Sequence, residues 1–381
     1  MTVKMFGTRN CPDVRAALET IAEKGLDVEF VNIDESTANL KLFLRLRDKA
    51  PEFDEIKKNG ESYYLISEEK RREMVKRSVA AITDIYQNSI LKDSSRNSFM
   101  IKRMEDLADR TIWAMGEQLK CGDFVPFVFE HKFNMEVGDG DRKQLMSGTI
   151  DRVDICENGT DVYVRIIDYK TGKKDFNIVK TYYGIDIQLM VYMEAAMKLV
   201  AKMRPGKNVI PAGVFYYNIS DPIVSATTES AEEIKDKIKG ELRLKGMVNS
   251  DKDIVEKMDN TEGTSLNIPV SRKADGGFDS RRSKVMNTEQ FNMLGRFVDV
   301  RAIDTADRIA GGDIRRSPYK DGQFSSCDRC PYGAVCGFSV DLPGCNYRKL
   351  KKFDDEVLWN NIKEGVDENG KKMDTGAEEC D

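Results

Sequence analysis

The strongest constraint on the fold is Asn158-Gly159, a two-residue step that joins two apolar segments carrying acidic residues. The first segment is Gly148–Asp154 and the second is Ile166–Lys170. Asn-Gly between apolar strand segments is a strong signal for a two-residue hairpin turn. The sequence therefore predicts an antiparallel hairpin across this region.

The predicted hairpin places three charged side chains on one face. A turn at Asn158-Gly159 pairs Glu157 with Thr160, so that Asp151 faces Ile166 and Asp168 lies diagonally two residues further along. Because side chains alternate across a strand, Asp151, Asp168 and Lys170 emerge together. Diagonal neighbours are about 7–8 Å apart, which lets two carboxylates share a metal ion. A three-residue loop would instead put Asp151 on the opposite face.

Two aspartates on apolar strands repel each other and resist burial, and a divalent cation removes both problems. Mg²⁺ takes oxygen ligands and keeps waters and substrate phosphate oxygens, so Asp151 and Asp168 are predicted magnesium ligands. Lys170 would stabilise the charge that develops at phosphorus or orient the attacking water. Glu130 is a candidate further ligand or water-positioning group, and Gln188 could anchor the lysine or DNA. The structural alternative is an exposed hairpin with Asp and Lys on its solvent face.

At these residues the sequence resembles the PD-(D/E)xK nucleases of the RecB type, and in particular the C-terminal nuclease domain of AddB subunits of bacterial helicase–nucleases. The resemblance covers about residues 65–350 and keeps the order of the motifs. The matching segments include Phe124–Glu130, Gly148–Asp154, Ile166–Gly172, Tyr182–Tyr192 and Cys327–Phe338.

The resemblance implies an α/β fold with a restriction-endonuclease-like core, in which a mixed sheet is flanked by helices. It implies that Asp151 and Asp168 bind the metal, that Lys170 is the catalytic lysine, and that Glu130 and Gln188 occupy accessory motif positions. The expected function is a metal-dependent DNA exonuclease that processes double-strand breaks for recombinational repair, with an AddA subunit as partner.

Two other functions stay open within the same fold. The motif set also occurs in CRISPR-associated iron–sulfur exonucleases, and a catalytically impaired module could bind DNA ends or dock on AddA. The sequence contains no Gly-x4-Gly-Lys-Ser/Thr loop, so we expect no ATP binding by this chain.

Three of the eight cysteines, Cys327, Cys330 and Cys336, lie within ten residues. Thiolates in this arrangement can hold zinc or an iron–sulfur cluster, and the spacing does not choose between them. A reduced structural group is the third possibility. The resemblance implies a 4Fe–4S cluster, but the upstream cysteine that AddB uses has no counterpart here. The fourth ligand is therefore unassigned, with Cys11, Cys121, Cys156 and Cys345 as alternatives.

Residues 1–60 are predicted to begin with strand, helix and strand, at Val3–Phe6, Pro12–Lys24 and Val28–Asn32. This segment and Cys11-Pro12 resemble part of a glutaredoxin-like thioredoxin fold. A second cysteine at the expected spacing is replaced by Val14, so a thiol oxidoreductase function using Cys11 is a minor alternative.

The remaining organisation follows from periodicity and charge. A helical region is expected at 61–120 and the nuclease domain at 121–352, with helices at Thr181–Met203 and Thr288–Ala310. Residues 353–381 hold ten acidic and three basic side chains, which predicts a solvated, disordered tail. Neither a signal peptide nor a bilayer-length apolar run is found in the sequence, so a cytoplasmic location is expected.

Overall fold

The computed structural model describes residues 3–7, 18, 20–25, 28–32, 67–85, 94–137, 144–225 and 229–367. The chain divides into two compact units, residues 1–70 and 71–381. Within the described ranges, none of the helices is both long and apolar enough to cross a lipid bilayer.

The first unit contains two parallel strands, β1 (Val3–Gly7) and β2 (Val28–Asn32), with helical residues at 20–23 between them. Parallel strands need a crossover connection, and the described part of that connection includes this helical turn. The two predicted strands are therefore confirmed, and most of the predicted helix at Pro12–Lys24 lies outside the described residues. Cys11 lies outside the described residues.

A mixed six-stranded sheet forms the centre of the second unit, in the order β3-β4-β5-β6-β7-β8. Neighbouring strands run antiparallel except for the β5–β6 and β7–β8 pairs, which are parallel. The strands are β3 (Val125–Val137), β4 (Gln144–Asn158), β5 (Asp161–Lys170), β6 (Asn208–Asn218), β7 (Lys245–Asn249) and β8 (Val285–Met286). A separate small sheet contains β9 (Tyr319–Asp321), β10 (Phe324–Ser325) and β11 (Arg348–Lys349).

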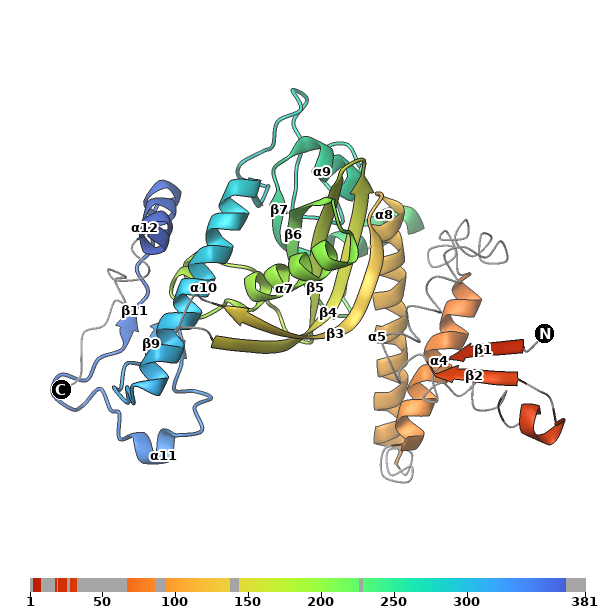
Figure 1. Cartoon of the computed structure of the whole chain (residues 1–381), viewed down its shortest axis with the longest axis horizontal. Helices are drawn as coiled ribbons and strands as arrows, with labels where there is room; N and C mark the ends of the chain where they lie inside the picture. Colours follow the sequence, from red (N-terminus) through yellow and green to blue (C-terminus); the bar gives the residue numbers. More distant parts are fainter. Residues whose placement is uncertain are drawn as a thin grey trace. The chain divides into compact units, whose positions relative to one another are not determined.

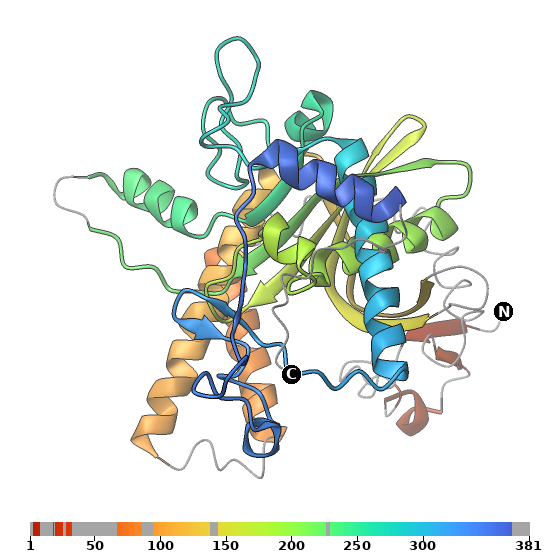
Figure 2. The same ribbon diagram turned by 90° about the vertical axis from the view of Figure 1, so that its left-hand side faces the viewer.

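Helices cover both faces of the six-stranded sheet, as Figures 1 and 2 show. One apolar core lies under α6 (Ile178–Tyr182), α7 (Gln188–Met203), α10 (Thr288–Ala310) and α12 (Asp355–Asp367). A second core lies on the other face, under α5 (Ser95–Lys120), α8 (Ala231–Glu241) and α9 (Lys252–Met258). The described residues also form α4 (Glu68–Ile85) and α11 (Gly333–Cys336). The predicted mixed sheet flanked by helices is confirmed.

The start of α10 follows directly from the sequence. The Asn287 side chain accepts the Gln290 backbone N–H at 2.8 Å, and the Gln290 side chain accepts the Asn287 N–H at 2.9 Å. This reciprocal capping satisfies two amide groups that a helix otherwise leaves open. The predicted bounds of this helix are confirmed.

The predicted continuous helix at Thr181–Met203 is wrong, because the structure breaks it into α6 and α7. Gly184 adopts φ +72°, a backbone conformation that ends a right-handed helix. The break lets Asp186 accept a hydrogen bond from Tyr216 on β6, and it makes Gln188 the first residue of α7.

The predicted disordered tail is wrong for its first part, because residues Asp355–Asp367 form α12. Leu358 and Ile362 are buried, and Val366 packs against the same core. Their four-residue spacing makes one apolar helical face, which outweighs the acidic residues on the opposite side. Residues 368–381 lie outside the described residues.

Candidate active site

The β4–β5 hairpin turns one residue later than predicted. Asn158 pairs with Asp161, and Gly159 carries the positive φ of +58° that the turn needs. Asn158 stays in the strand because its amide donates to the Tyr163 hydroxyl at 3.2 Å and to Asp253 at 2.9 Å. The pair that closes the hairpin is therefore Asn158 with Asp161 and not Glu157 with Thr160 as expected. The turn still contains two residues, so the alternation of faces is unchanged.

Asp151 lies directly across from Asp168 in this register, rather than diagonally. The last β4–β5 pair is Arg152 with Ile167, and Asp151 and Asp168 occupy the next step. There the Asp151 carboxylate accepts the backbone N–H of Tyr169 at 2.8 Å. The Asp151 side chain thus binds a backbone N–H of β5 just beyond the last β4–β5 pair. This bond keeps one Asp151 carboxylate oxygen beside β5.

The Asp168 carboxylate is buried and surrounded by oriented polar groups. Its Oδ1 accepts from the Gln188 amide at 3.3 Å, and that amide also donates to the Tyr192 hydroxyl at 2.9 Å. Its Oδ2 forms an ion pair with the Lys170 ammonium. Burial raises the pKa of Asp168, Lys170 opposes that rise, and the nearby Asp151 charge adds to it. The site therefore concentrates negative charge that a cation would stabilise.

Glu130 is placed near this group without contacting it. The β3–β4 pairs Phe129–Arg152 and His131–Ile150 flank Glu130, so its backbone lies level with Asp151. Its φ is +47°, which is costly for a residue with a side chain. The side chain is exposed, and within the described ranges it makes no hydrogen bond or ion pair with either aspartate. The structure thus brings together Asp151, Asp168 and Lys170, which we call the carboxylate–lysine group. Gln188 contacts this group, and Glu130 lies at its edge.

Two charged residues next to this group were not singled out from the sequence. The Lys174 ammonium lies 3.2 Å from Asp186 Oδ1 and 4.8 Å from the centre of the Tyr216 ring. The Tyr216 hydroxyl donates to Asp186 at 2.8 Å, and burial together with Asp186 raises the pKa of Tyr216. The sequence signal was weak, because Lys174 stands between two other charged residues, Lys173 and Asp175, and belongs to no recognisable motif.

Comparison with known proteins supplies the family. The profile of the PD-(D/E)XK nuclease superfamily matches residues 54–337, which include every residue of the carboxylate–lysine group. The chain belongs to this superfamily. The fold class expected from the motifs is therefore confirmed.

Several curated relatives of this PD-(D/E)XK chain are named as the B subunit of an ATP-dependent helicase/deoxyribonuclease. The protein of Lachnoclostridium phytofermentans is 35% identical over 84% of the chain and 28% of its own length. That of Thermoanaerobacter sp. is 34% identical over 75% and 25%, and that of Clostridium botulinum is 36% identical over 73% and 25%. The chain thus spans about a quarter of the length of these relatives. The predicted resemblance to the B subunits is confirmed.

The carboxylate pair of this PD-(D/E)XK site fits a hard divalent cation. Mg²⁺ is held in proteins by one or two carboxylates, with waters and substrate phosphates completing its shell. Asp168 is a buried carboxylate beside a second carboxylate, that of Asp151. Among the described residues, only Lys170 and Gln188 contact the Asp168 oxygens. Oxygen donors of this kind suit magnesium and are a poor match for softer metals.

The cysteine loop gives a different result. Cys327, Cys330 and Cys336 lie on one loop between β10 and the end of α11, but the described residues contain no group of three or more metal-ligating side chains. The expected convergence of the three thiols is thus not found. The loop is held instead by its own bonds, such as Ser325 Oγ to Asp328 at 2.7 Å. Thiolates suit an iron–sulfur cluster in kind, but their placement does not form a ligand set.

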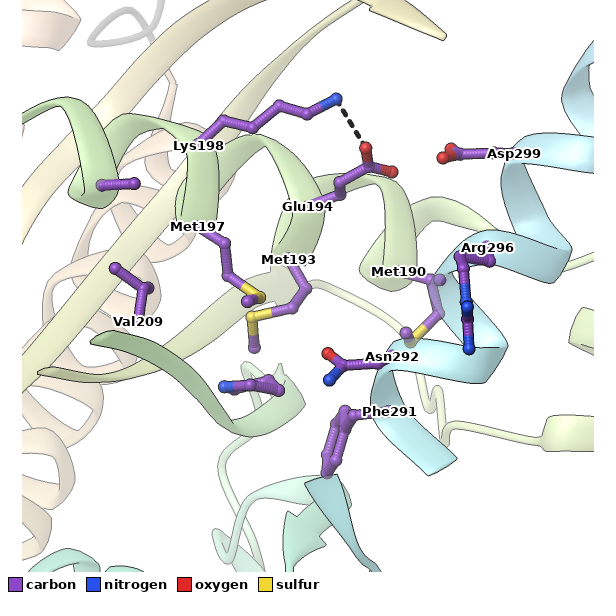
Figure 3. A pocket seen from close by; sticks show the side chains of 13 residues that line it. Met190, Met193, Glu194, Met197, Lys198, Val209, Phe291, Asn292, Arg296 and Asp299 are labelled. Carbon is purple, nitrogen blue, oxygen red and sulfur yellow. Dashed lines mark ion pairs between the residues drawn. The ribbon is translucent and has the colours of Figure 1, made fainter. Parts of the chain in front are cut away.

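A separate cavity of about 580 Å³ lies between α7, α10 and β6 (Figure 3). Met190, Met193 and Met197 line it from α7, and none of the carboxylate–lysine group borders it. At its rim, Glu194 forms an ion pair with Lys198 at 2.5 Å and faces Asp299. Burial and the neighbouring Glu194 carboxyl raise the pKa of Asp299 to about 8. α7 therefore supplies Gln188 to the candidate site and methionines to a distinct apolar cavity.

Proposed function

We propose that the chain is a Mg²⁺-dependent DNA nuclease that removes nucleotides from DNA ends during double-strand-break repair. The observation that carries this proposal is the meeting of Asp151, Asp168 and Lys170 at the open end of the β4–β5 ladder. Family membership and the names of the similar B subunits support a DNA substrate. A DNA substrate is also consistent with the cytoplasmic location expected from the sequence.

Each side chain has a separate role in the proposed reaction. Asp151 and Asp168 would hold the magnesium ion, which lowers the pKa of an attacking water and neutralises phosphate charge when bound. The Gln188 amide holds one oxygen of Asp168 and thereby orients its carboxylate. The Lys170 ammonium sits beside the other oxygen, where it can stabilise the negative charge that builds on the phosphate in the transition state.

The experiment is cleavage of linear DNA labelled at either end, with Mg²⁺ and with chelator. We expect cleavage only with Mg²⁺, and a loss of more than about 100-fold in Asp168→Asn, because the variant lacks a charged metal ligand. Asp161→Asn is the matched control, since Asp161 begins the same strand at the hairpin end, away from the site. Binding of DNA without Mg²⁺-dependent cleavage would replace the nuclease proposal with a DNA-end-binding module.

We further propose an AddA-type helicase subunit as partner. The relatives are named as B subunits of an ATP-dependent helicase/deoxyribonuclease, and the present sequence carries no phosphate-binding loop for ATP. Co-migration of the two purified subunits on size exclusion would support the assignment. Two independent peaks at micromolar concentrations would argue against a stable complex.

A 4Fe–4S cluster held by Cys327, Cys330 and Cys336 is proposed as a structural cofactor, with its fourth ligand unassigned. The support is the spacing of the three thiols within one loop and the resemblance to the B subunits. Holding a metal would require the loop to close around it, since the described thiols are not gathered. No step of the proposed cleavage depends on this cluster.

A further inference from the structure

We propose that Lys174 is a phosphate-binding lysine beside this site, held in place by Asn218 and Asp186, and that it contacts the DNA strand next to the phosphate under attack. This inference rests on the nuclease function proposed above. It assigns a substrate contact to a loop residue that lies outside the family's motif positions in this chain.

The backbone of Lys174 is fixed by a two-way clamp. Its N–H donates to the Asn218 side-chain oxygen at 3.0 Å, and its carbonyl accepts from the Asn218 amide nitrogen at 2.9 Å. Asn218 ends β6 in register with Lys170, and the next N–H, from Ile219, donates to the Lys170 carbonyl at 2.8 Å. The loop after β5 therefore returns to the same strand ends that carry Lys170.

The side chain of Lys174 is directed by a second set of contacts. Tyr216 pairs with Asp168 on the neighbouring strand, so its ring lies beside the carboxylate group. The ammonium groups of Lys170 and Lys174 lie 5.7 Å and 4.8 Å from the centre of that ring. Two cations thus flank one tyrosine at the edge of the metal site.

Asp186 holds the Lys174 ammonium in place and leaves part of the lysine side chain exposed. The Asp186 side chain is 7% exposed and is held by the Tyr216 hydroxyl at 2.8 Å, while the Lys174 side chain remains 37% exposed. A lysine that served only to neutralise a buried carboxylate could be covered completely. Here the ammonium keeps an open side, so it can donate to a phosphate oxygen while it remains paired.

The central test compares Lys174→Ala with Lys173→Ala. Lys173 is the matched control, because it carries the same charge on the same loop and is exposed. In steady-state cleavage, we expect Lys174→Ala to raise KM about tenfold with a smaller change in kcat, and Lys174→Arg to recover most of the loss. A phosphate contact also contributes about one unit to the slope of log Kd against log salt concentration. Lys174→Ala in an Asp168→Asn background should reduce that slope by about one, and Lys173→Ala should not.

Several outcomes separate this inference from the proposed function. If wild-type protein cleaves DNA and the KM and salt slope of Lys174→Ala match those of Lys173→Ala, the phosphate contact is wrong. A lower melting temperature in Lys174→Ala with unchanged KM would assign Lys174 a structural role and also overturn the inference. If wild-type protein does not cleave DNA at all, the nuclease proposal fails, and the salt slope still decides whether Lys174 binds phosphate.

The anchoring role of Asp186 is tested by a double-mutant cycle. Asp186→Asn keeps the size of the side chain and leaves Lys174 without its charged partner. We expect Asp186→Asn to raise KM less than Lys174→Ala does, and the double variant to resemble Lys174→Ala alone. Tyr216→Phe removes only the hydroxyl that holds Asp186 and guards against a folding defect in Asp186→Asn. Fully additive effects in the cycle would refute the anchoring.

Discussion

Removing the negative charge of Asp154 should destabilise the fold more than any surface change in the same strand. Asp154 is fully buried between two arginines. Arg152 donates to both of its oxygens at 2.6 Å, and Arg165 donates at 2.9 Å. Burial alone would raise the pKa of Asp154, but the two guanidinium groups hold that pKa below its ordinary value. The carboxylate is therefore ionised and compensates two buried cations.

The expected magnitude follows from this geometry. Asp154→Asn keeps the shape of the side chain but removes the negative charge that both guanidinium groups contact. Breaking a buried ion pair by removing one partner costs about 3–5 kcal/mol. In a domain of this size each kcal/mol shifts the melting temperature by roughly 2–4 °C, so a fall of roughly 6–20 °C is expected.

Thermal unfolding followed by circular dichroism measures the effect, with Glu157→Gln as the matched control. Glu157 lies on the same strand and pairs with Arg204 at 2.8 Å, but its side chain is 42% exposed. Solvent screens such pairs, and their loss costs about 1 kcal/mol or less. If Asp154→Asn and Glu157→Gln change the melting temperature equally, the buried network does not stabilise the fold as argued.

Three further predictions concern the site, the cavity and the cysteines. Asp168→Ala and Lys170→Ala should each abolish Mg²⁺-dependent cleavage while leaving DNA affinity nearly unchanged, and retained cleavage in either purified variant would contradict their roles. Asp299 keeps its proton in the folded state up to pH about 8 and loses it in the unfolded chain at pH about 4, so its contribution to stability falls as pH rises between these values. Asp299→Asn lacks this titration, so the melting temperature of the variant minus that of wild type should rise from pH 5 to pH 9. A constant difference across that range would refute the assignment. Anaerobically purified protein should contain iron and sulfide that are lost in Cys327→Ser but not in Cys380→Ser, which changes a cysteine that is not a candidate ligand, and equal iron in the two variants would exclude the cysteine loop as the cluster site.

The hairpin shows both how far local sequence signals reach and where they stop. Asn158-Gly159 predicts a two-residue turn, and the turn has that length. The register differs by one residue because the Asn158 amide contacts Asp253, almost a hundred positions away in the chain. A local motif contains no information about such a partner, so its turn type is better predicted than its pairing.

Periodicity predicted α10 well, because one side of this helix meets the core. The bounds of α10 follow from a capping pattern at Asn287 and a regular apolar face. The same kind of face exists in α12, but the acidic composition around it favours a disordered tail when the sequence is read alone. Leu358 and Ile362 are buried in the core to which α10 contributes, and α12 packs against α10. The acidic composition reflects the solvent-exposed side of such a helix, and packing of the apolar side decides whether the helix forms.

By itself, the sequence determined the two N-terminal strands, the hairpin and the three charged residues that it carries, Asp151, Asp168 and Lys170. These follow from turn chemistry and alternation, which act over a few residues. Only the tertiary structure decided the level pairing of the two aspartates and the meeting of Lys174 with Asp186. That meeting depends on the parallel pairing of β5 with β6, which are separated in the chain by two helices. Parallel strands are brought together by burial of both sheet faces, and burial depends on surfaces contributed by the whole domain.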